Sequence, residues 1–195
     1  MPTRLVDLGQ AGTAGVVLVV DTPRVGNLED GRYCCLSHCW GGFQPVKLET
    51  KTSQLLRSGL PLQQLPKTFQ DAVEVCLWLG VRYLWIDSLC IIQDSKEDWE
   101  REAEQMALIY KYGHATLAAT DSRDATSGLF RDRYPSSIVA PLSRVIHLDS
   151  VAETQVQTAC VVDKNLWLQG IELAPLNQRA WVLQVRWTMC PLIME

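Results

Sequence analysis

The segment Arg82–Asp94, RYLWIDSLCIIQD, decides the fold of this chain. It opens with a short run of bulky residues, Arg82–Asp87, that ends on a carboxylate. Almost every residue before Asp87 is bulky, as is typical of a central parallel strand that is buried on both faces. The segment therefore predicts a buried strand with Asp87 at its carboxyl end, followed by a polar turn.

A long amphipathic helix is expected after this turn, ending at Tyr112 before Gly113. Asp94 or Ser95 caps it, because each is followed three positions later by an acidic residue, the spacing of a capping box. The inner stripe of the helix is expected to consist of Trp99, Ala103, Met106 and Tyr110.

The other expected elements follow from apolar runs and their boundaries. Pro66–Gly80 has apolar residues at helical spacing, with proline at its start and glycine after its end. Strands are expected at Val16–Val20, Arg32–Trp40 and Ala115–Thr120, and two weaker antiparallel strands at Ser137–Val145 and Thr158–Val162. Strand, helix, strand, helix, strand implies right-handed crossovers. The expected fold is α/β, with a mostly parallel central sheet flanked by helices and additional antiparallel strands.

We expect one main domain in this chain. Residues 1–31 are assigned to an N-terminal strand or hairpin extension, 32–185 to the α/β domain and 186–195 to a C-terminal tail. A chain of 195 residues suits this organisation.

Charge and composition exclude several functional classes. The chain has 18 Lys and Arg against 22 Asp and Glu, a net charge of −4, and no basic patch that would indicate a nucleic-acid partner. No apolar run approaches the roughly 18 residues of a membrane span. Seven cysteines without a C-x-x-C pair indicate reduced, buried thiols and a cytoplasmic protein.

Three predicted strands end in polar groups, at Ser37-His38, at Asp87 and at Thr120-Asp121. Ligands of open α/β sheets bind beyond the carboxyl ends of the parallel strands. If the three strands are neighbours, these groups converge on one crevice. Asp87 is the leading candidate, and capping of the following turn is an equally good explanation of its position.

Other residues near these strand ends are candidates for chemistry. Cys34 and Cys35 point to opposite faces of a strand, which argues against a metal site. A nucleophilic pair of Cys90 or Cys39 with His38 competes with the commoner role of a small buried thiol. Trp40, beside Gly41, is the aromatic residue expected to face a ligand, and Glu100 is expected to lean toward the crevice.

The ordered motifs of this chain resemble the fungal heterokaryon incompatibility (HET) domain. They are Tyr33–Gly41 (YCCLSHCWG), Leu65–Ala72 (LPKTFQDA), Arg82–Asp94, Trp99–Arg101, Met106, Ile109-Tyr110 and Pro175–Gln184 (PLNQRAWVLQ). The family's motif residues fall on Ser37, Trp40, Gly41, Asp87, Cys90, Gln93, Glu100, Tyr110, Trp181 and Gln184. The resemblance implies a fungal cytoplasmic protein of self/non-self recognition and programmed cell death.

The same family has been likened to Toll/interleukin-receptor (TIR) domains, some of which cleave NAD. This likeness implies NAD as a candidate substrate, with no cofactor otherwise expected. Asp87 and Glu100 would then be the catalytic carboxylates, and the ligand-binding residues would be Ser37, His38, Trp40, Gly41, Cys90, Gln93 and Asp121.

Two positions depart from the family pattern. Ile92 stands where the family usually has Asn, and Val185 stands where it usually has Glu. Two alternatives to an NAD glycohydrolase therefore stay open. One is a non-catalytic module that signals by self-association or by assembly with another protein of the HET pathway. The other is a small enzyme recruited to fungal specialised metabolism.

Overall fold

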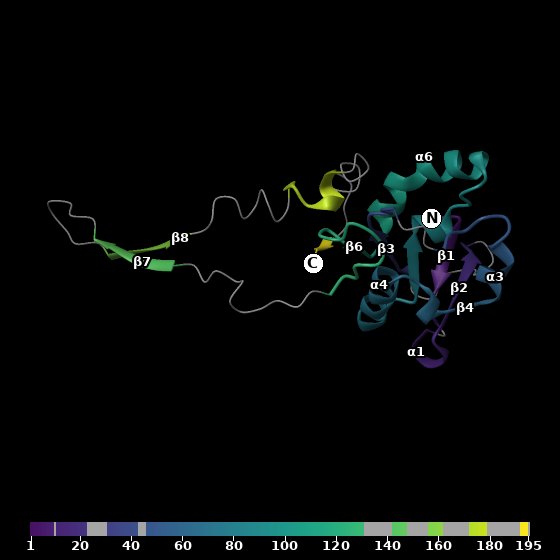
Figure 1. The fold of residues 1–195 in the computed structure, drawn as a ribbon, viewed down its shortest axis with the longest axis horizontal. Helices are drawn as coiled ribbons and strands as arrows, with labels where there is room; N and C mark the ends of the chain where they lie inside the picture. The colour runs from purple at the N-terminus through teal and green to yellow at the C-terminus, as the bar shows by residue number, and fades with distance from the viewer. Residues whose placement is uncertain are drawn as a thin grey trace.

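A seven-stranded mixed sheet organises the part of the chain that the structure describes. The computed structural model describes residues 1–9, 11–22, 31–42, 46–130, 142–147, 156–161, 172–178 and 192–194. The order of the strands in the sheet is β4-β2-β1-β5-β3-β6-β9 (Figure 1). Their bounds are β1 Arg4–Asp7, β2 Val16–Asp21, β3 Tyr33–Ser37, β4 Leu60–Pro61, β5 Tyr83–Ile86, β6 Ala115–Ala118 and β9 Leu192–Met194.

Parallel pairing is confined to one half of this sheet. β5, β3, β6 and β9 pair in parallel, whereas β1 pairs antiparallel with both β2 and β5, and β2 pairs antiparallel with β4. The fold is therefore α/β with a mixed sheet. The three strands expected to be parallel neighbours are neighbours, and the expected N-terminal hairpin is the β1–β2 pair. The two weaker strands form a separate antiparallel pair, β7 Leu142–His147 and β8 Val156–Val161.

Helices α4, Lys67–Trp78, and α6, Lys96–Tyr112, cover opposite faces of the strand β3. Cys34 hydrogen-bonds to Cys76 of α4, whereas the thiol of Cys35 points to the carbonyl oxygen of Ile109 in α6. The alternation expected for these two cysteines is confirmed. Further helical segments are α1 Ala11–Ala14, α3 Ser53–Ser58, η2 Leu62–Gln64, α5 Asp87–Cys90 and η4 Pro175–Gln178.

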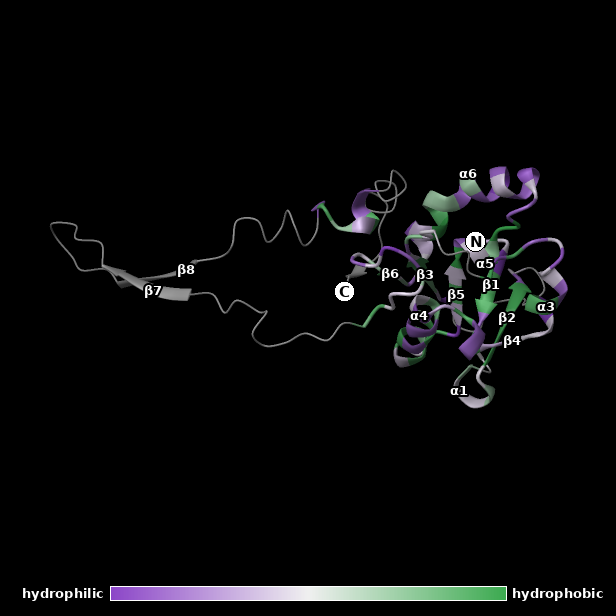
Figure 2. Cartoon of the chain, viewed as in Figure 1, coloured by the Kyte–Doolittle hydropathy of each residue, from purple (hydrophilic) through white to green (hydrophobic). Residues whose placement is uncertain are grey.

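The core is formed by the strands and the inner faces of these helices. Trp85, Tyr33, Tyr83 and Phe69 are its largest fully buried side chains. Figure 2 shows hydrophobic residues along β1 and β2, and hydrophilic residues along the first turns of α6. Within the described ranges, no helix combines the length and the apolar composition needed to cross a membrane.

The expected inner stripe of α6 is wrong at its start. Trp99 is 44% exposed, whereas Asp98 and Glu102 are buried and face the core beside Ile109 and Tyr110. Charged residues can face a core only when they are paired. Asp98 pairs with Arg4 of β1 and with Arg101 of α6, and Nε of Arg101 lies 3.7 Å from Oε1 of Glu102. The expected cap is confirmed at Ser95, whose hydroxyl accepts a hydrogen bond from the backbone N–H of Asp98.

Candidate functional site

The Asp87 carboxylate lies at the carboxyl end of β5 and is held by two hydrogen bonds. Its Oδ2 accepts a hydrogen bond from the indole Nε1 of Trp40 at 2.9 Å, and its Oδ1 accepts one from the backbone N–H of Ser88 at 2.7 Å. The side chain is 25% exposed. The carboxylate therefore has a fixed orientation and remains accessible to a ligand.

The end of β3 lies beside Asp87 because β3 and β5 are parallel neighbours. Leu36 pairs with Ile86, so Ser37 and the residues after it continue next to Asp87. The imidazole Nδ1 of His38 is 3.9 Å from Asp87 Oδ1, close enough for electrostatic interaction and too far for a hydrogen bond.

His38 lies beside Asp87 and packs against α4. Its side chain is fully buried, and its ring meets the ring of Phe69 edge-on, with centroids 4.9 Å apart. An imidazole in this position is oriented by packing, next to the carboxylate.

Gly41, which follows Trp40, packs closely against the loop that follows β6. Gly41 has a φ of +63°, and a Cβ atom on it would lie 2.3 Å from the Cβ of Asp124. Only glycine fits this close approach. The loop is fixed to α4 in turn, because the backbone N–H of Leu129 donates to the buried carboxylate of Asp71 at 2.8 Å.

Gln93 and Cys90 lie in the turn after Asp87, and Cys90 is fully buried. The Gln93 side-chain amide donates to the carbonyl oxygens of Asp87, at 3.1 Å, and of Ile91, at 2.9 Å. Burial raises the pKa of the Cys90 thiol to about 12, so it is neutral at pH 7 and a poor nucleophile.

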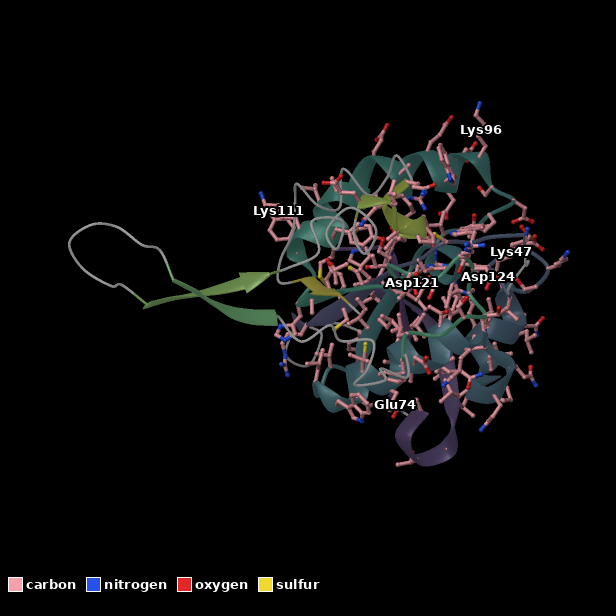
Figure 3. The ribbon with its side chains drawn as sticks, turned by 60° about the vertical axis from the view of Figure 1, so that its left-hand side comes forward. Lys47, Glu74, Lys96, Lys111, Asp121 and Asp124 are labelled. Carbon is pink, nitrogen blue, oxygen red and sulfur yellow. The ribbon has the colours of Figure 1, made fainter. Side chains whose placement is uncertain are left out.

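Glu100 and Asp121, the two other acidic candidates, are both exposed. Glu100 is two residues from Asp98 and from Glu102, about 200° around the helix, so it lies on the outer face of α6. Its carboxylate is 3.6 Å from Nζ of Lys96, which points away from the body of the protein in Figure 3. The structure thus brings together Ser37, His38, Trp40, Gly41 and Asp87, and places Glu100 apart from them.

Two residues that hold the site were not found from the sequence. Arg4, on β1, donates to the carbonyl oxygen of Cys90 at 2.7 Å, and Asp71, on α4, anchors the loop beside Gly41. Each could have been found as a charged residue within an otherwise apolar stretch of sequence. Of the remaining motif positions, Ile92 donates its backbone N–H to Asp98, and Trp181, Gln184 and Val185 lie outside the described residues.

A cavity of about 500 Å³ lies at the other end of the sheet and shares no residue with the Asp87 site. Leu8, Leu77 and Val81 line it, together with Asp7 and Arg82. Nε and Nη2 of Arg82 donate to the Asp7 carboxylate at 2.8 and 3.0 Å. This cavity offers mainly apolar walls, whereas the polar groups at the ends of parallel strands lie around Asp87.

Comparison with known proteins gives one match. The model of the family described as heterokaryon incompatibility protein (HET) matches residues 33–184 of the chain. No match is found among curated proteins or among solved structures. The matched range includes β3, α4, β5 and α6, and with them Ser37, His38, Trp40, Gly41 and Asp87, whereas Arg4 lies outside it.

Proposed function

The chain belongs to the heterokaryon incompatibility (HET) family, and on that basis we propose that it acts in self/non-self recognition by binding an NAD-type nucleotide at Asp87. The supporting observation is the anchored, partly exposed carboxylate at the end of a parallel strand. A fungal origin, a cytoplasmic location and a role in programmed cell death belong to the same proposal. The five cysteines that the structure describes are buried thiols, which agrees with a reducing compartment.

Asp87 suits the ribose of such a nucleotide. Each carboxylate oxygen already accepts one hydrogen bond from the protein and can accept another. Two adjacent ribose hydroxyls can therefore donate to the two oxygens without displacing Trp40 or Ser88. This arrangement costs the protein little reorganisation on binding, because the carboxylate is oriented in advance.

Trp40 contributes a ring as well as a hydrogen bond. Its indole N–H donates to Asp87, which fixes the edge of the ring against the carboxylate. The ring is only partly buried. A partly exposed indole offers its face to a planar base, and stacking of this kind tolerates nicotinamide or adenine alike.

Cleavage of NAD at this site would use Asp87 electrostatically. The bond between nicotinamide nitrogen and ribose C1′ breaks, nicotinamide leaves with the bonding electrons, and positive charge develops on the ribose. The negative Asp87 carboxylate stabilises that charge, and water then adds at C1′ and releases a proton, giving ADP-ribose.

A non-catalytic signalling module is the second candidate. Glu100 is 56% exposed and paired with Lys96, and the family's usual Glu is replaced by Val185. Asp87 is then left without a second carboxylate of the motif beside it. Under this alternative the protein binds the nucleotide, or a partner protein, and signals by self-association without consuming NAD.

Thermal unfolding with NAD and with ADP-ribose tests the binding. A ligand at 100 times its dissociation constant adds about 2.7 kcal/mol to the free energy of unfolding. Asp87→Asn should abolish this stabilisation, and the exposed control Asp94→Asn should retain it. Equal stabilisation of both variants contradicts the assignment of Asp87. Release of nicotinamide by the wild-type protein separates the enzyme from the signalling module.

A further inference from the structure

The turn that carries Asp87 is a single helical turn, α5, which cannot hold its own shape. Four residues form too few internal hydrogen bonds to be stable alone, and the carbonyl groups of such a turn need outside donors. The carbonyl oxygen of Ser88 accepts from the backbone N–H of Leu48 at 2.8 Å, and that of Cys90 accepts from Nε of Arg4 at 2.7 Å. α5 is therefore shaped by segments distant in sequence.

Arg4 and Asp98 form a clamp across Ile91, the residue that leaves α5. Arg4 holds the carbonyl group that precedes Ile91, and Oδ2 of Asp98 accepts from the backbone N–H that follows it, on Ile92, at 2.8 Å. The two side chains are joined to each other by a hydrogen-bonded ion pair. One connected unit thus fixes both peptide groups around Ile91.

The clamp is buried, and one of its two residues, Arg4, lies outside the matched family region. Arg4 is 4% exposed and Asp98 is 5% exposed. Arg4 lies on β1, and the register Val6↔Leu84 directs it toward the end of β5 that leads into Asp87. The family match begins at residue 33, so the N-terminal strand supplies a part that the match does not include.

We propose that Arg4 and Asp98 are positioning residues that orient the Asp87 carboxylate toward Trp40 through α5. The N-terminal strand is then a functional part of the site. What Asp87 binds rests on the proposed function, but the positioning itself does not. Arg4 acts as a forked donor that serves a carbonyl group and a carboxylate at once, which a lysine cannot reproduce.

The indole N–H of Trp40 reports the position of Asp87 without any ligand. In the full ¹⁵N-labelled chain, its resonance is assigned by its loss in Trp40→Phe. Arg4→Lys keeps the positive charge but cannot donate to the Cys90 carbonyl oxygen and the Asp98 carboxylate at once. Asp98→Asn weakens the bond to Arg4 and keeps an acceptor for the backbone N–H of Ile92. We expect both variants to shift the Trp40 indole resonance and to weaken NAD binding by about tenfold, the effect of about one lost hydrogen bond.

The matched control is Arg57→Lys, which breaks a forked ion pair with Asp21 in the same N-terminal hairpin and does not touch α5. It should leave the Trp40 resonance in place. A folded Arg4→Lys protein with the wild-type Trp40 resonance overturns the proposal, and Asp98→Asn decides it if Arg4→Lys does not fold. If the resonance moves but no variant, wild type included, binds NAD, the positioning role stands and the proposed ligand fails.

Discussion

Replacing Gly41 by alanine tests how closely the backbone after Trp40 packs against the loop that follows β6. The alanine would keep a φ of +63°, a left-handed conformation that costs an L-residue about 1–2 kcal/mol. Its Cβ would lie 2.3 Å from the Cβ of Asp124 and 3.0 Å from the carbonyl oxygen of Arg123. Overpacking of this kind costs about 1–3 kcal/mol more. We expect Gly41→Ala to lower the free energy of unfolding by about 2–5 kcal/mol.

Gly80 provides a control with the same backbone conformation and no steric conflict. Its φ is +65°, and nothing lies within 4 Å of a Cβ built on it. Urea unfolding of Gly80→Ala should therefore show only the conformational cost, about 1–2 kcal/mol. Repeating Gly41→Ala in an Asp124→Gly background should recover part of the difference, because the nearest clashing atom is removed. Equal losses in Gly41→Ala and Gly80→Ala would refute the packing argument.

Three further predictions concern buried groups around the site. Asp71→Ala should cost about 1–3 kcal/mol in urea unfolding, because the N–H of Leu129 loses its acceptor, whereas the exposed Glu74→Ala (Figure 3) should change stability by less than about 0.5 kcal/mol. Native Cys90 should resist iodoacetamide at pH 8, since burial raises the pKa of its thiol to about 12; mass spectrometry should find it alkylated only after unfolding. Desolvation raises the pKa of Asp98, but its arginine and backbone partners outweigh this and lower the pKa. The ionised form therefore stabilises the fold above the ordinary carboxyl pKa, and this contribution is lost as the pH falls through the lowered value. Asp98→Asn should flatten the loss of stability on acidification.

Three of the four parallel strands, β3, β5 and β6, were predictable because they are apolar runs with polar ends, whereas β9 lies in residues expected to be a tail. β3, β5 and β6 each form from such a run, and each run is followed by a polar group at the same edge of the sheet. The position of Asp87 at the end of β5 was predictable for the same reason. Hydrophobic pattern is a local signal, and these strands are buried on both faces, so the signal is strong.

The clamp behind Asp87 could not be predicted from such patterns. Asp98 and Glu102 occupy the inner face of α6, where periodicity predicts apolar residues, and Trp99 points outward. Of the two arginines that pair with Asp98, the buried one is Arg4, 94 residues away in the sequence. A charge becomes acceptable in a core only through its partner, and no local pattern identifies a partner that lies on another strand.

That separation also has a consequence for the order in which the protein is synthesised. The ribosome adds about 5–20 residues per second, so about 5–19 s pass between the addition of Arg4 and that of Asp98, 94 residues later. For most of this interval β5 has not been synthesised, so Leu5 and Val6, which end up fully buried between β2 and β5, have β2 as their only sheet partner. The nascent N-terminus must therefore remain open to chaperones until β5 and α6 emerge, and a pause in translation before residue 98 would lengthen this exposure.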